Sequence, residues 1–206
     1  ADIFAKIENK EFVEKKHVKK AIYEKHKRLS KIENKMDEYI QNNTIMIDTE
    51  GSRVGVINGL SVLSMGEYSF GRPSRITVTT SMGNRGLVNI EREVKMSGPI
   101  HNKSVLILQG YLTEHFAQEY SLSINAYICF EQNYGGIEGD SATLAELCAL
   151  LSSLSNVPIK QNIAVTGSLN QKGDIQVVGG ITEKIEGFYN VCKKRGLDNK
   201  TYGVIL

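Results

Sequence analysis

The sequence of 206 residues has few of the residue groups that usually build metal sites. Its four histidines form no cluster, and its three cysteines form no Cys-x-x-Cys pair, so we expect no bound metal. The cysteines are odd in number and each lies among apolar neighbours, which favours buried free thiols in a reducing compartment over a disulfide framework. They are Cys129, Cys148 and Cys192.

Long apolar runs, a P-loop and a strong net charge are also missing. No run approaches the roughly 20 residues of a membrane-spanning helix, and no charged-then-apolar start marks a signal peptide. The Gly-x-x-x-x-Gly-Lys-Ser/Thr pattern does not occur, which argues against a nucleotide-binding enzyme of the P-loop kind. The formal net charge of +2 does not by itself indicate a nucleic acid partner.

The residues that are present predict an α+β (mixed α/β) domain preceded by a helical segment. Residues 2–40 contain no Gly or Pro and repeat apolar residues at near-helical spacing, which predicts one or two amphipathic helices. Acidic residues are interleaved with the basic ones, which favours a linker or packing helix over a basic nucleic-acid patch. We therefore assign residues 1–43 to a helical connector and residues 44–206 to the folded domain.

After residue 43 the sequence pattern changes to short strands with helices between them. Asn58-Gly59 is typical of a turn or bulge and interrupts the second strand. The expected helices cover 104–120, 141–155 and 181–195. The expected strands cover 44–49, 53–65, 75–80, 86–94, 122–130, 162–168, 174–178 and 202–206.

Ser141 stands where a largely apolar helix is expected to begin, after Gly135, Gly136 and Gly139. Glycines permit tight turns, and the free N–H groups of a helix start favour negative charge. A serine nucleophile held there would have backbone donors beside it for the oxyanion that forms in acyl transfer. A simpler alternative remains open, because Asp140 or Ser141 would also serve as an N-cap.

Lys184 is a second candidate, in the first turn of the last expected helix. It lies at the border of the apolar face of that helix, about 60° from Ile181 at 100° per residue. Burial and the positive end of the helix dipole both lower the pKa of a lysine, as a base near neutral pH requires. The alternative is a surface lysine that bonds Glu183 or a loop carbonyl.

Taken together, three motifs resemble the proteolytic domain of Lon proteases. They are Glu-Gly-Asp-Ser-Ala-Thr (Glu138–Thr143), Thr-Gly-Ser-Leu-Asn-Gln (Thr166–Gln171) and Gly-Gly-Ile-Thr-Glu-Lys (Gly179–Lys184). The Gly-Asp-Ser-Ala form is similar to the B-type branch and to Lon-related ATP-dependent proteases. The resemblance extends from about residue 44 to the end, and the upstream segments that fit it are 54–62, 70–77, 89–93 and 98–103.

The resemblance implies roles for individual residues. Ser141 matches the nucleophile of the family, Lys184 the general base, and Thr166 a threonine that supports the lysine. Glu138 and Asp140 match acidic residues that adjust the site, and either one paired with Lys184 as a cation would hold an inactive resting arrangement. The expected oxyanion donors are the backbone amides of Gly139, Asp140 and Ser141.

The same resemblance implies a cytoplasmic serine endopeptidase with a Ser-Lys dyad, part of an ATP-dependent Lon-like protease that degrades unfolded or regulatory proteins. Its partners would be polypeptide substrates and, at full length, further copies in a hexameric ring, with no nucleic acid required. The chain itself would hold no cofactor. ATP and Mg would belong to a separate ATPase module, since a start at Ala1 and a stop within a strand suggest a piece of a longer protein, truncated at its C-terminal end.

Two departures from the family pattern are visible. Thr143 stands where serine is frequent, and the Pro- and Asn-bearing loop that usually follows the last strand is not in this sequence. The alternative function is a non-catalytic Lon-like assembly or binding module of an ATPase, which the presence of both Ser141 and Lys184 disfavours. An extended substrate would add to an exposed strand edge at Val54–Val62, unless that segment is an internal strand.

Overall fold

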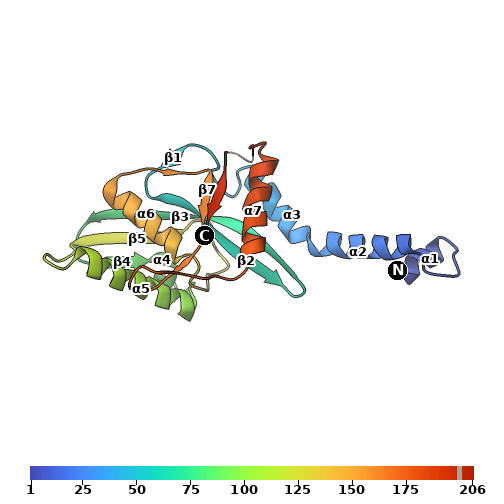
Figure 1. Cartoon of the computed structure of the whole chain (residues 1–206), viewed down its shortest axis with the longest axis horizontal. Coiled ribbons are helices and arrows are strands. Elements are labelled where there is room, and N and C mark those ends of the chain that lie inside the picture. The colour runs from blue at the N-terminus through green and yellow to red at the C-terminus, as the bar shows by residue number, and fades with distance from the viewer. Residues whose placement is uncertain (199–200) are drawn as a thin grey trace.

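The computed structural model describes residues 1–198 and 201–206, in which helices pack on a six-stranded mixed sheet of order β10-β7-β2-β3-β5-β4 (Figure 1). This combination confirms the predicted α+β class. The strands of the main sheet are β2 (Val56–Met65), β3 (Tyr68–Met82), β4 (Gly86–Asn89), β5 (Ile124–Phe130), β7 (Ile163–Val165) and β10 (Gly203–Ile205). The short strands pair as β1 (Ser52–Arg53) with β6 (Ile159–Lys160) and β8 (Ser168–Leu169) with β9 (Ile175–Gln176).

Apolar residues of β2 alternate between two cores, one on each face of the sheet. Ile57 packs in the core that α5 (Pro99–Phe116) and α6 (Thr143–Ser155) cover. Leu60 packs on the opposite face with Phe188 of α7 (Ile181–Lys194). Because successive strand side chains point to opposite faces, this spacing places α6 and α7 on different sides of the sheet.

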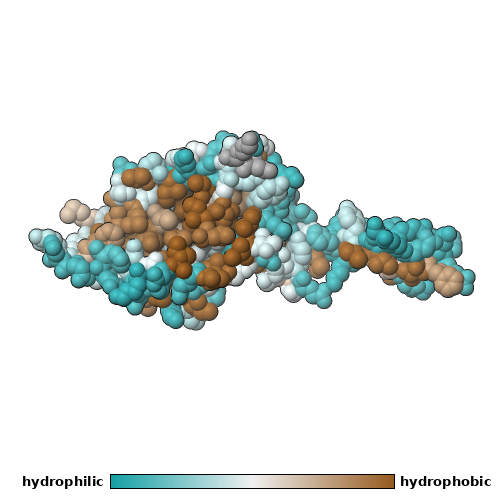
Figure 2. All heavy atoms as spheres, viewed as in Figure 1, coloured by the Kyte–Doolittle hydropathy of each residue, from teal (hydrophilic) through white to brown (hydrophobic). Residues whose placement is uncertain are grey.

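Three helices, rather than the expected one or two, form the N-terminal segment: α1 (Asp2–Ile7), α2 (Lys15–Leu29) and α3 (Lys31–Gln41). Asn9, with a φ of 54°, follows α1, and the buried His17 ring bonds Glu8 at 3.1 Å. The α2 helix projects from the body (Figure 1), and Figure 2 shows an apolar stripe along it. Val18 and Ile22 are exposed apolar residues of this helix.

The α3 helix returns to the body and is attached to the end of α7. Arg195 donates to the carbonyl oxygen of Ile40 at 2.9 Å, and Lys194 forms an ion pair with Asp37. This attachment fixes one end of the helix that carries Lys184.

The expected strand at 44–49 is wrong. Side chains take the place of a strand partner there: Arg195 donates to the carbonyl oxygen of Ile47 at 2.5 Å, and Gln132 accepts from the amide of Met46 at 2.7 Å. The expected strand at 86–94 is also wrong in its second half, where α4 (Ile90–Glu93) begins because the Asn89 side chain accepts from the backbone amide of Arg92.

The turn expected at Asn58-Gly59 is also wrong, because β2 runs straight through it and pairs with Arg75 and Ser74. The buried Asn58 side chain donates to the carbonyl oxygens of Asp48 and Gln161, at 2.8 Å each. The hairpin instead turns at Gly66, whose φ is 64°. Long-range hydrogen bonds therefore override the local turn preference of Asn-Gly.

The other expected elements exist with shifted ends. The helix expected from 104 begins at Pro99, and the strand expected over 75–80 extends over Tyr68–Met82. The strand expected over 162–168 is divided between β7 and β8. All the cysteines are free thiols, with Cys192 buried and the other two half-buried.

Two glycines allow α7 to lie directly on β3. A Cβ atom built on Gly71 would lie 1.9 Å from the carbonyl oxygen of Glu183, and one built on Gly187 would lie 2.2 Å from the carbonyl oxygen of Gly71. Both contacts are with backbone atoms, which cannot move aside as a flexible side chain can. This close approach sets the height of Lys184 above the sheet.

We expect Gly187→Ala to destabilise the protein by about 3 kcal/mol, the upper part of the overpacking range. In a solvent-exposed helix the same substitution would instead stabilise the protein by about 1 kcal/mol. A destabilising effect would therefore indicate that Gly187 is closely packed. Thermal melting would measure the effect. The control is Gly203→Ala, where an added Cβ meets nothing within 4 Å; equal melting temperatures for the two variants would contradict the prediction.

Candidate active site

Ser141 lies in the turn that leads into α6, which begins at Thr143 rather than at the expected residue 141. The carbonyl oxygen of Ser141 accepts from the backbone amide of Gly167 at 2.8 Å and from Thr166 Oγ1 at 3.0 Å. The chain that follows β7 therefore holds the backbone of Ser141 and leaves its hydroxyl group free to meet another side chain.

Lys184 reaches this hydroxyl from the other side of the sheet. Its side chain is 3% exposed, and its Nζ lies 2.9 Å from Ser141 Oγ and 3.1 Å from Thr166 Oγ1. Thr166 is fully buried and follows directly after β7. The structure thus brings Ser141, Lys184 and Thr166 together at the end of β7, between α6 on one face of the sheet and α7 on the other.

Burial lowers the pKa of Lys184, and the negative charge of Asp140 acts in the opposite direction. A buried amine with a lowered pKa spends more of its time neutral near neutral pH and is then able to accept a proton. Asp140 is bonded elsewhere, since its Oδ2 accepts from Ser168 Oγ at 2.9 Å, and the hydrogen bonds of Lys184 Nζ go to Ser141 and Thr166. Among the described residues Lys184 forms no ion pair.

Glu138 is bonded to the start of α5 and not to Lys184. Its Oε1 accepts from the backbone amide of Ile100 at 3.0 Å, so this carboxylate satisfies one of the free donors of that helix start. Gly98 makes room for it, since a Cβ there would lie 1.3 Å from Glu138 Oε2. The pairing of Glu138 or Asp140 with Lys184, expected as one alternative, is therefore not the arrangement of this structure.

The backbone amides expected to bind an oxyanion belong to an open loop. In the described part of the chain, the amides of Gly139, Asp140 and Ser141 donate to no protein acceptor. Gly139 has a φ of 92°, in the region that favours glycine. These amides are therefore not used by the described protein acceptors.

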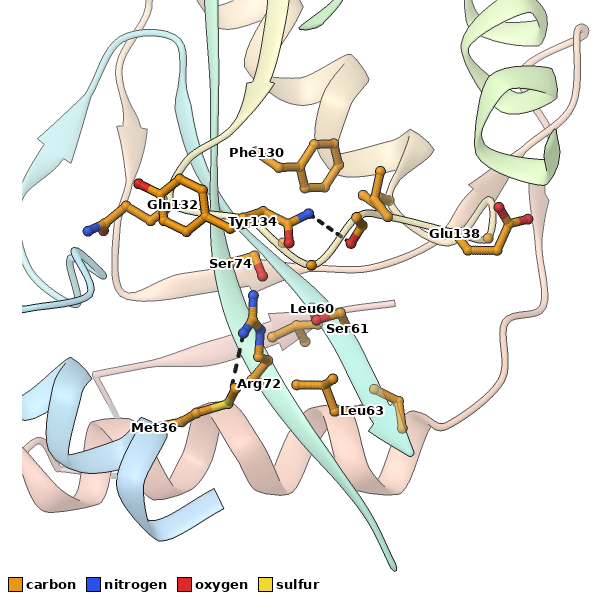
Figure 3. Close-up of a pocket in the computed structure, with 18 of the residues that line it drawn as sticks. Met36, Leu60, Ser61, Leu63, Arg72, Ser74, Phe130, Gln132, Tyr134 and Glu138 are labelled. Atoms are coloured by element: carbon orange, nitrogen blue, oxygen red, sulfur yellow. Dashed lines mark hydrogen bonds between the residues drawn. The ribbon is translucent and has the colours of Figure 1, made fainter. Parts of the chain in front are cut away.

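A cleft of about 530 Å³ opens next to Ser141, between β2 and residues 132–142 (Figure 3). The β2 strand pairs with β7 only at Asn58 and Gly59, so its edge beyond Gly59 has no strand partner among the described residues. The expected edge at Val54–Val62 is thus internal in part and open from Leu60 onward. An extended chain placed along this edge would pass the hydroxyl group of Ser141.

Behind the loop lies a buried polar cluster that the sequence pattern did not indicate. His101 Nε2 accepts from Asn89 Nδ2 at 3.2 Å and lies 3.6 Å from Glu146 Oε1. Burial, and secondarily the charge of Glu91, raise the pKa of Glu146 to about 8, while burial lowers the pKa of His101. Both groups are then mainly neutral at pH 7, which suits their position between α5 and α6.

Arg72 is another residue of the site that the sequence analysis did not single out. It lines the cleft from β3, opposite Ser61 of β2. Period-two alternation from the buried Ile76 through Ser74 to Arg72 would have placed it on this face of the sheet. Nothing in that alternation, however, indicates an open cleft at this end of the strand.

The described residues offer neither a metal site nor a membrane-spanning helix. They contain no group of three or more His, Cys, Asp or Glu side chains that could hold a metal ion. None of their helices combines the length and the apolar character needed to cross a membrane.

Comparison with known proteins finds one matching family and several relatives. Residues 31–191 match the Lon protease (S16) C-terminal proteolytic domain. A Lon protease homologue of Escherichia coli (strain K12) is 44% identical over 174 residues, which are 84% of this chain and 30% of that protein. One from Haemophilus influenzae is 42% identical over 81% of this chain and 28% of that protein. An archaeal Lon protease of Thermoplasma volcanium is 35% identical over 67% of this chain and 21% of that protein.

Proposed function

This chain belongs to the Lon protease (S16) family of C-terminal proteolytic domains, and we propose that it is a serine endopeptidase that uses Ser141 and Lys184 as a catalytic dyad. The observation that carries the proposal is the separation of 2.9 Å between Lys184 Nζ and Ser141 Oγ. It falls within the range in which a base takes a proton from a nucleophile. Thr166 supports the lysine at 3.1 Å.

In the proposed reaction, neutral Lys184 takes the hydroxyl proton of Ser141, and Oγ bonds to the carbonyl carbon of a peptide. The backbone amides of Gly139 to Ser141 bind the resulting oxyanion. Lys184 then gives the proton to the leaving amine as the C–N bond breaks. Water next loses a proton to Lys184, attacks the acyl ester and releases Ser141, whose Oγ regains that proton.

The substrate is proposed to be a polypeptide in extended conformation. The edge of β2 beyond Gly59 would supply backbone hydrogen bonds, which bind a chain with little regard to its sequence. Such a mode suits unfolded or regulatory proteins, since an unfolded segment offers free backbone N–H and C=O groups to a strand edge.

The chain spans less than a third of the length of the curated relatives above, so the working assembly is also a proposal. We place this domain in the cytoplasm, in a hexameric ring whose subunits carry an ATPase module that binds ATP and Mg. Residues 1–43 would connect the two parts, and no nucleic acid is required. The rival proposal, a non-catalytic assembly module, needs the same family membership but no reactive serine.

A fluorophosphonate probe separates these two functions. We expect the native protein to be labelled on Ser141, as located by peptide mapping, because only a serine activated by a base reacts at a useful rate. Heat-unfolded protein is the control and should not react. Absence of labelling, together with absence of casein cleavage with and without ATP, would favour the assembly module.

A further inference from the structure

Arg72 places a positive charge in the wall of the cleft, where the described residues give it no acidic partner. Its Nη1 lies 3.8 Å from Met36 Sδ, and no carboxylate among the described residues pairs with it. By contrast, Arg75, its neighbour on the same strand, lies 2.9 Å from the carboxylate of Asp48. Burial lowers the pKa of Arg72, with no nearby charge acting in the opposite direction.

The Arg72 guanidinium points into the cleft. Figure 3 shows it between the β2 residues Leu60 and Ser61 and the segment that carries Gln132 and Tyr134. Among the described residues that line this cleft, the one acidic side chain is Glu138, whose Oε1 accepts from the α5 amide and which forms no ion pair with Arg72. The cleft therefore holds a cation that no carboxylate of the described residues contacts.

The other walls of the cleft are largely apolar and include Met36, Leu63, Phe130 and Tyr134. A cation in such surroundings is costly unless an anion joins it, and the attraction between them exceeds that in water. The planar guanidinium group suits a carboxylate, which it binds through two parallel hydrogen bonds. The same cleft also reaches Ser141, the proposed nucleophile.

We propose that Arg72 is a specificity-determining residue that binds an acidic side chain, Asp or Glu, of the substrate within a few residues of the cleaved bond. This inference rests on the proposed peptidase function and adds a substrate preference to it. The edge of β2 holds the peptide backbone, and Arg72, opposite Ser61 in the β2–β3 ladder, selects one side chain beside that edge.

Paired fluorogenic peptides test the preference. Each pair carries Glu or its neutral isostere Gln at one position near the cleavage site, with both ends blocked so that no terminal carboxylate competes. We expect kcat/KM at low salt to favour Glu by about 10-fold to 100-fold at one position, as for a charge-assisted hydrogen bond. A Gln peptide with a free C-terminus shows whether a terminal carboxylate binds instead.

Arg72→Met should bring the ratio of kcat/KM for the Glu peptide to that for the Gln peptide close to one, mainly by slowing cleavage of the Glu peptide. Arg72→Lys should keep part of the preference, because it retains a charge but not the planar fork. The matched control is Arg85→Met, since Arg85 lies outside the cleft and contacts Tyr127. Its ratio should equal that of the wild type.

Binding of the same peptides to Ser141→Ala by fluorescence anisotropy gives a readout that needs no catalysis. Tighter binding of the Glu peptide should be lost in the Ser141→Ala, Arg72→Met double variant. Equal handling of Glu and Gln peptides at every position would overturn the inference, whether or not the protein cleaves. Absence of cleavage and labelling with the binding preference intact would reject the peptidase function alone.

Discussion

Ser141→Ala is expected to abolish casein cleavage while the melting temperature stays nearly unchanged. Without Oγ no acyl ester forms, and losses on the order of 10⁴-fold or more are usual for the nucleophile of a dyad or triad. The effect on stability should be small, because the backbone of Ser141 keeps its hydrogen bonds from Gly167 and Thr166. The variant loses one side-chain hydrogen bond, worth about 1 kcal/mol.

The matched control for this variant is Ser155→Ala, at the exposed far end of α6, the helix that Ser141 precedes. It should retain full activity, since its Oγ donates to the carbonyl oxygen of Leu151, one helical turn earlier. Casein cleavage by both variants would be followed together with thermal melting. Activity retained in Ser141→Ala would reject the assignment of the nucleophile.

Lys184→Met should lose activity to a similar degree. The methionine side chain fills most of the same space but accepts no proton, so Ser141 Oγ would keep its hydrogen. In the wild type, activity should rise with pH as the amine becomes neutral, and should begin below the ordinary lysine pKa because burial lowers it. The pH profile of kcat/KM would measure this rise.

The same shift predicts how stability depends on pH. In the range below a pKa of about 10.4 the unfolded chain binds more protons at Lys184 than the folded protein does. The free energy of unfolding of the wild type should therefore increase with pH through that range, and this contribution should be missing in Lys184→Met. Lys193→Met, an exposed position on α7, is the control for both measurements. Cleavage by Lys184→Met at alkaline pH would show that another base acts.

Local sequence was sufficient for the class of the fold and for most elements. The apolar stripe of α7 and the apolar circumference of α6 predicted both helices to within two residues. Such patterns depend on residues three or four positions apart. Burial of the apolar face stabilises a helix of this kind in nearly any tertiary context. The motifs also identified Ser141, Thr166 and Lys184 as candidates.

The tertiary structure decided which distant groups individual side chains bond. Asn58-Gly59 has the local preference of a turn, yet the buried amide of Asn58 finds acceptors 10 and 103 residues away and stays in a strand. Glu138 has the sequence position of a residue that pairs with the lysine, yet it bonds the start of α5, 38 residues away in sequence. Local sequence patterns do not predict partners so far away in the sequence.

The sequence alone therefore identified which side chains are candidates for the chemistry, and the fold decided which of them meet. Ser141 and Lys184 are 43 residues apart; Ser141 directly precedes α6, and Lys184 belongs to α7 on the opposite face of the sheet. They come within 2.9 Å because β7 ends beside them and because glycines let α7 lie directly on β3. Hydrogen bonding and close packing act between atoms in space, so a distance of this kind follows only from the folded chain.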